Sequence, residues 1–109
     1  MEADDPMKSR IVVLVATFVM GLSMAAMADG AATFKAKCAM CHGADGSGSS
    51  SMGKSMGLKD LGSADVQSMS DADLAALISN GKGKMPAYKG KLSDSDIADV
   101  VKYIRTLKK

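Results

Sequence analysis

The sequence predicts an all-α fold, a compact bundle of three or more short helices that follows an N-terminal leader. The chain has 109 residues, enough for one small domain. Two stretches after residue 70 carry apolar side chains at helical spacing, and each is preceded by a serine of the kind that caps helices. No stretch alternates apolar and polar residues as a half-buried strand does, and no internal repeat is present.

The leader is expected over residues 1–28 and has the layout of a secretory signal peptide. Lys8 and Arg10 precede an uncharged, largely apolar run of 18 residues. The run ends with small residues at Ala26 and Ala28, as signal-peptidase sites do. We therefore expect export, with cleavage directly after Ala28.

Cleavage leaves residues 29–109 as one domain in the periplasm or another exported, oxidising compartment. Residues 1–6 are acidic and do not suit the start of such a leader, so they are interpreted as a start-site extension before Met7. Two alternatives remain. An uncleaved leader would anchor the protein in a membrane, although 18 residues is close to the shortest spanning length. The run could also form a buried core helix.

Two helices are expected in the first part of the domain and in its middle. The first runs from Gly30 to about Lys37. The second begins after Ser70, which has Asp73 three residues later as in a capping box, and it ends at Gly81. Its apolar face consists of Leu74, Leu77 and Ile78.

A third helix is expected at the C-terminus. Ser93 is its N-cap, and Asp96 takes the third helical position. Arg105, Lys108 and Lys109 lie toward its C-terminal end, where a helix dipole favours cations. Its apolar stripe comprises Ile97, Val100, Val101, Ile104 and Leu107.

Two loops connect these helices. Residues 43–57 hold five Gly and five Ser in 15 positions, which predicts a loop rather than a packed helix. A loop of this length in a compact domain is usually functional. Residues 82–92 form the second loop, between the last two helices.

Composition excludes several classes of function. Fourteen Lys and Arg against 12 Asp and Glu give a net charge of +2, too balanced for a dedicated nucleic-acid binder. A single His excludes any site that needs two imidazoles from this chain. The domain also has few rigid apolar residues, so it needs a metal, a disulfide, a partner subunit or a large cofactor to stabilise it.

The sequence Cys38-Ala39-Met40-Cys41-His42 predicts covalent attachment of one haem c. Two thiols at this spacing reach the two vinyl groups on one edge of a porphyrin, and His42 projects under the ring to the iron. The alternatives are a redox-active cysteine pair, which needs a preceding strand, half of a zinc site, which needs two further ligands, and a strained disulfide. Export favours haem, because attachment of this kind happens outside the cytoplasm.

A methionine is the natural second axial ligand, because His42 is the only histidine. Met85 is favoured, since glycines before it let the backbone approach the ring and Pro86 stiffens the segment. Met52 and Met56, in the Gly/Ser-rich segment, are the alternatives. The methionines outside the leader are Met40, Met52, Met56, Met69 and Met85. The expected site is thus Cys38, Cys41, His42 and Met85, with iron held by His42 and Met85.

With these residues, the domain resembles the class I c-type cytochromes, small monohaem electron carriers, over about residues 29–109. Gly30 and Phe34 resemble the Gly-x-x-x-aromatic of the family's first helix, and Met85-Pro86 resembles its ligand loop. Val100, Tyr103 and Ile104 resemble the positions at which the last helix packs on the first. The resemblance implies that these two helices cross nearly perpendicularly, with Gly30 permitting their contact.

The sequence departs from the family in one respect. Many members have a proline between the haem motif and the middle helix, and its carbonyl bonds to the axial histidine. Residues 43–84 contain no proline. Another carbonyl is therefore expected to orient His42.

The expected function is that of an exported carrier of single electrons, not an enzyme. No histidine remains for acid–base catalysis, and His42 with Met85 saturates the iron. The alternatives are a cytochrome subunit of a larger redox enzyme, and a haem-based sensor of small ligands if Met85 is not the sixth ligand.

The expected partners are redox proteins, with no nucleic acid and no stable membrane span after cleavage. A group of lysines near Met85 indicates docking on acidic surfaces. The alternative is a solvated loop without such a role. The lysines are Lys82, Lys84, Lys89 and Lys91.

Overall fold

The structure is a computed structural model, and it describes residues 28–109. The signal peptide and the start-site extension lie outside the described residues, except for Ala28, and stay predictions. Within the described range, no helix is long and apolar enough to cross a membrane.

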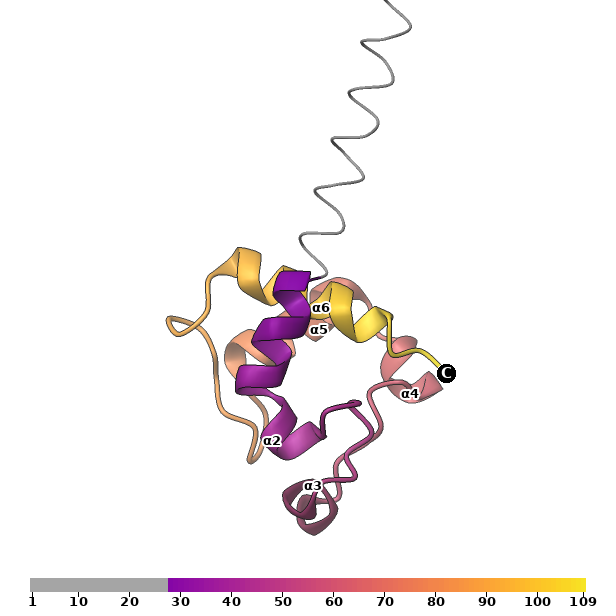
Figure 1. The fold of residues 1–109 in the computed structure, drawn as a ribbon. Helices are drawn as coiled ribbons and strands as arrows, with labels where there is room; N and C mark the ends of the chain where they lie inside the picture. The colour runs from indigo at the N-terminus through magenta and orange to yellow at the C-terminus, as the bar shows by residue number, and fades with distance from the viewer. Residues whose placement is uncertain (1–27) are drawn as a thin grey trace, which may run out of the picture.

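The described chain is built from helices, which confirms the predicted all-α class (Figure 1). Residues 28–37 are helical, as the sequence predicted for Gly30 onward. The helices that follow are α2 (Ala39–His42), α3 (Ser51–Met56), α4 (Ala64–Gln67), α5 (Asp71–Asn80) and α6 (Asp94–Arg105). Over residues 28–109 extended pairing is confined to isolated bridges in the segment 82–92.

The two longest labelled helices, α5 and α6, begin where their capping serines predicted. The Ser70 hydroxyl accepts a hydrogen bond from the Asp73 amide at 3.0 Å. Ser93 and Asp96 form a reciprocal capping box, with bonds of 3.0 Å and 3.2 Å. Helix α5 ends at Gly81, as expected. These starts are encoded locally, because each cap needs residues only three positions apart.

Helix α6 ends earlier than its apolar stripe predicted. The helix ends at Arg105, so Leu107 lies in the turn beyond it. Lys109 turns back instead, donating its amide to the carbonyl of Gly62 at 3.1 Å and pairing its side chain with Asp60. This fold-back replaces the last helical turn that the stripe indicated.

The N-terminal helical segment crosses α6 at a steep angle (Figure 1). Gly30 is buried at the crossing, and a β-carbon there would overlap the carbonyl of Asp99. One turn further along, the Phe34 ring packs on Tyr103 with their centroids 5.1 Å apart. The buried core comprises Phe34, Val66, Leu74, Ile78, Ile97, Val100, Val101 and Ile104. The core therefore lies between the N-terminal helix, α4, α5 and α6.

The predicted loop at residues 43–57 is wrong in its second half, because α3 forms there. The Ser50 hydroxyl caps the helix by accepting from the Gly53 amide at 2.9 Å. Gly57 ends it in the left-handed conformation, with φ 66°. At Gly53 a β-carbon would lie 2.5 Å from the carbonyl oxygen of Cys41. Glycine at this position therefore permits close packing of α3 on α2, a contact that local propensity does not reveal.

The short helix α4 was not predicted, because four residues carry no readable periodicity. One side chain of α4 and one of α6 tie the two helices together. The side-chain amide of Gln67 donates to the carbonyls of Leu61 and Ile104 at 2.8 and 3.0 Å. Arg105 donates to the Gln67 carbonyl at 3.0 Å and to the Met69 carbonyl at 2.6 Å. Arg105 thus joins α6 to the α4–α5 connection, beyond the dipole role expected of it.

Candidate functional site

A cavity of about 560 Å³ brings the four predicted site residues together. Cys38, Cys41 and His42 line it from the motif helix, and Met85 lines it from the segment between α5 and α6. Its volume falls within the roughly 300–1,000 Å³ of cofactor and small-molecule sites. Other lining residues include Met56 of α3, Leu77 of α5 and Tyr88.

The motif residues are positioned by α2 and by the chain that follows it. Cys38 is the N-cap of α2, and the His42 amide donates to the Cys38 carbonyl at 3.0 Å. Residues three apart in such a turn share a face, which directs both cysteines to the cavity. Two hydrogen bonds hold the C-terminal end of α2. The Ser50 hydroxyl donates to the Cys41 carbonyl at 2.7 Å, and the Gly48 amide donates to the His42 carbonyl at 2.7 Å.

No disulfide joins Cys38 and Cys41. Burial, and then the neighbouring Cys41, raise the pKa of the Cys38 thiol from 9.0 to about 11. Redox-active cysteine pairs have a lowered pKa and follow a strand, whereas Cys38 follows a helix. Among the described residues, no three of His, Cys, Asp and Glu lie together as ligands of a metal ion, as a zinc site would require.

The imidazole of His42 lines the cavity. Its Nδ1 atom is buried and has no hydrogen-bond partner among the described residues. The carbonyl expected to orient His42 is therefore not found within residues 28–109. Burial lowers the pKa of His42, so the imidazole is neutral at pH 7 and can act as a ligand. A neutral imidazole that lines the same cavity as two cysteines fits a covalently attached haem.

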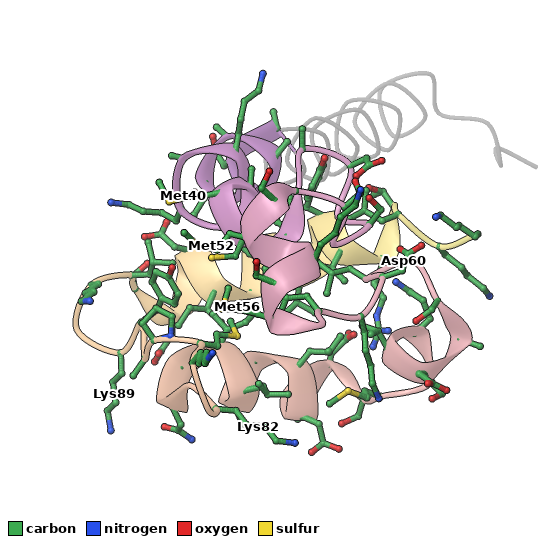
Figure 2. All side chains as sticks on the ribbon, turned by 90° about the horizontal axis from the view of Figure 1, so that it is seen from below. Met40, Met52, Met56, Asp60, Lys82 and Lys89 are labelled. Atoms are coloured by element: carbon green, nitrogen blue, oxygen red, sulfur yellow. The ribbon has the colours of Figure 1, made fainter. Side chains whose placement is uncertain are left out.

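The structure separates the candidate methionine ligands, of which Figure 2 labels Met52 and Met56. Met85 and Met56 line the cavity, whereas Met52 does not. The Met52 side chain is 46% exposed, and its sulfur accepts a hydrogen bond from the Cys41 thiol at 3.4 Å. Met40 is 74% exposed. The sequence placed Met52 and Met56 in a loop, but both belong to α3. Met56 is thus the one rival of Met85 that the described cavity admits.

The Met85 backbone is held in a tight turn. Its amide donates to the Lys82 carbonyl at 3.0 Å, and its carbonyl accepts from the Lys82 amide at 3.2 Å. Gly81 lies directly behind this turn, with a φ of 75°, and a β-carbon there would be 2.7 Å from the Met85 carbonyl oxygen. Glycine is therefore required where α5 gives way to the Met85 segment.

Lysines line the cavity, and two of them belong to the group that the sequence indicated. Lys82 and Lys84 line it, whereas Lys89 and Lys91 lie outside its lining. Figure 2 shows Lys82 and Lys89 extending away from the ribbon. Lysines from two other segments line it as well, and none of the described lining residues is acidic. These additional lysines, which sequence reasoning missed, are Lys37 and Lys59.

Comparison with known proteins places the chain among cytochromes. Residues 25–104 match the family described as cytochrome C oxidase, cbb3-type, subunit III. Cytochrome c6 of Leptolyngbya boryana is 40% identical over 77 residues, which cover 71% of this chain and 87% of that protein. Cytochrome c6 of a Picosynechococcus species is 37% identical over 101 residues, 86% of each chain.

Two further matches extend the comparison. Cytochrome c6 of a Synechocystis species is 38% identical over 78 residues, and the match spans 72% of this chain but only 62% of that protein's length. Among solved structures, the KustC0563 c-type cytochrome superposes with a TM-score of 0.68 at 28% identity. That superposition covers 73% of this chain and 98% of the other.

Proposed function

The chain belongs to the class I c-type cytochromes, which hold a covalently bound haem c, and from this premise we propose that it is an exported carrier of single electrons whose iron is bound by His42 and Met85. When bound, the haem supplies an iron that alternates between the ferric and ferrous states. The proposal rests above all on one observation: the only histidine, both cysteines and Met85 line one cavity.

We assign haem attachment to Cys38 and Cys41. Both line the cavity from the same turn of the motif helix. The two bonds from Ser50 and Gly48 to the carbonyls at the end of α2 support this assignment, because they hold the motif against the cavity wall. A motif held on a rigid element keeps its cofactor in one orientation toward partners.

We assign the two axial positions to His42 and Met85. His42 lines the cavity beside Cys41, and histidine is a common axial ligand of haem iron. Met85 is preferred over Met56 because both of its backbone polar groups are held in the turn with Lys82. A thioether on such a turn needs little further ordering to be held at a fixed place. Met56 is instead the last residue of α3, a helix of six residues.

Both axial positions are then filled by protein, which leaves no open site for a substrate. This agrees with relatives that are electron carriers and not enzymes. Methionine ligation favours the ferrous state relative to a second histidine and so raises the reduction potential. Such a carrier suits the oxidising end of an electron-transfer chain.

We further propose that partners dock through acidic surfaces at the cavity mouth. The four lysines that line the cavity carry positive charge, and one of them, Lys59, is partly compensated by Asp65 at 3.8 Å. That pair is exposed and weak. The remaining positive charge would steer an acidic partner toward the haem edge.

A second candidate is a cytochrome subunit of a larger redox enzyme, which the name of the matching family favours. Against it, the cytochrome c6 relatives of Leptolyngbya and Picosynechococcus are matched over 87% and 86% of their own length, so they are about the size of this chain. Affinity purification of the native protein distinguishes the two. A carrier elutes alone at the mass of the domain, whereas a subunit elutes with stable partner chains.

The axial assignment is tested by absorption spectroscopy of the purified holoprotein. We expect Met85→Ala to abolish the thioether–iron absorption of the ferric protein, to lower the reduction potential and to allow added small ligands to bind. Met56→Ala is the matched control, because its side chain lines the same cavity, and Met52→Ala controls for a methionine outside it. Loss of the absorption in Met56→Ala but not in Met85→Ala contradicts the assignment. No change in any variant favours the sensor alternative.

A further inference from the structure

We propose that the hydroxyl of Tyr88 latches the Met85 segment to the helix that precedes Cys38, and that this latch slows the departure of Met85 from the iron. The inference rests on the proposed function, since it takes Met85 as the sixth ligand. It assigns Tyr88 a positioning role, because the residue acts through Met85 and not on the iron.

The backbone hydrogen bonds that leave the segment carrying Met85 go to α5. The Tyr88 amide donates to the Ile78 carbonyl at 3.1 Å, and the Lys89 amide donates to the Ser79 carbonyl at 3.0 Å. The remaining backbone bonds of residues 82–92 lie within the segment. These bonds hold the segment to the helix from which it emerges, and none of them reaches the haem motif.

One hydrogen bond of the described structure joins the segment that carries Met85 to the helix that precedes Cys38. The Tyr88 hydroxyl donates to the Lys37 carbonyl at 2.9 Å, across 51 positions of sequence. Among the hydrogen bonds of the described residues, no other joins residues 82–92 to residues 28–42. Lys37 directly precedes Cys38, and Tyr88 follows Met85 by one short stretch of chain. The bond therefore links the two segments that carry the attachment site and the sixth ligand.

The acceptor is available because the helix is interrupted at this point. Residue 38 forms a turn between the helical segment 28–37 and α2. The Cys41 amide bonds to the Cys38 carbonyl at 3.2 Å and so does not take the Lys37 carbonyl four residues back. A carbonyl freed at a helix end needs another donor or water. Tyr88 supplies that donor at the edge of the cavity, which both residues line.

Removal of the hydroxyl isolates this effect. Tyr88→Phe keeps the aromatic ring that packs against the core and removes only the bond to Lys37. A hydrogen bond of this kind typically changes an equilibrium by about two- to tenfold. The segment should then open more often, and Met85 should leave the iron by the same factor more often.

The experiment measures how fast imidazole binds to the ferric holoprotein, because imidazole can bind only after Met85 leaves. Tyr103→Phe is the matched control: its ring packs on Phe34, and its hydroxyl makes no hydrogen bond among the described residues. We expect imidazole to bind about two- to tenfold faster to Tyr88→Phe, and as fast as to wild type for Tyr103→Phe. The thioether–iron absorption should also disappear at a lower temperature in Tyr88→Phe, before the helices unfold by circular dichroism.

The outcomes separate the latch from the axial assignment. Wild-type protein without the thioether–iron absorption contradicts Met85 ligation, and the latch with it. If the absorption is present but Tyr88→Phe binds imidazole at the wild-type rate, the latch is wrong and the axial assignment stands. Equal acceleration in both tyrosine variants also overturns the latch, because it indicates a general effect of ring packing.

Discussion

Gly30 packs directly on the backbone of Asp99, where the N-terminal helix crosses α6. A β-carbon at Gly30 would lie 2.7 Å from the carbonyl carbon of Asp99 and 3.3 Å from the β-carbon of Tyr103. The close atoms on the Asp99 side belong to the backbone of a helix, so they cannot move aside as a side chain could. This contact sets the distance between the two helices and, through the N-terminal helix, the place of the haem motif at its end.

Gly30→Ala is therefore expected to destabilise the protein despite the better helix propensity of alanine. Overpacking at a rigid contact costs about 1–3 kcal/mol, against a gain of about 1 kcal/mol or less from propensity. The measurement is chemical denaturation of the holoprotein followed by circular dichroism. Ala32→Ser, at an exposed position of the same segment, should change the free energy of unfolding by no more than about 0.5 kcal/mol. Equal stability of Gly30→Ala and wild type would show that the crossing can relax.

Haem attachment is expected to be a condition for folding. Among residues 28–109 the buried core consists of eight apolar residues, and a cavity of about 560 Å³ lies beside it. We expect the double variant Cys38→Ala, Cys41→Ala to remain largely unfolded after export, because a small core without its cofactor does not offset the chain entropy. Circular dichroism tests this, and a cooperative thermal transition in the haem-free double variant contradicts it.

The lysines that line the cavity are expected to govern the association with redox partners. The bimolecular rate of electron transfer with an acidic partner should fall as salt rises, since the screening length is ~10 Å near 0.1 M. Stopped-flow rates should also be lower for Lys82→Gln with Lys84→Gln than for wild type, and the salt dependence weaker. Lys89→Gln with Lys91→Gln is the control of equal charge, outside the cavity lining. A rate that does not respond to ionic strength supports the solvated-loop alternative.

Arg105 is expected to stabilise the fold through its bonds to the α4–α5 connection. Its guanidinium donates to the Met69 carbonyl at 2.6 Å, to the Gln67 carbonyl at 3.0 Å and to the Asp71 carboxylate at 2.9 Å. Arg105→Ala leaves two backbone carbonyls without this donor and should cost about 1–3 kcal/mol in denaturation experiments. Lys102→Ala, at an exposed position of the same helix, should have little effect. Equal losses in the two variants would argue against a specific role for these bonds.

The comparison of α3 and α5 explains which helices could be predicted. Helix α5 has its cap at Ser70 and its apolar face within a few residues of each other, so local sequence predicts it. Helix α3 is rich in glycine and serine, which disfavour a helix in isolation. It forms because Gly53 packs against the Cys41 carbonyl. In addition, the Ser50 hydroxyl hydrogen-bonds both to that carbonyl and to the Gly53 amide. Partners outside the segment thus override its propensity.

Sequence alone determined the all-α class, the capped starts of α5 and α6, and the grouping of Cys38, Cys41 and His42. Each of these features depends on residues within one or two helical turns of one another. Tertiary structure decided which methionines reach the cavity, separating Met85 and Met56 from Met52. It also decided which lysines line it, and it brought Tyr88 to the Lys37 carbonyl. These arrangements join residues distant in sequence, and no local pattern encodes such contacts, because they follow from how the helices pack on one another.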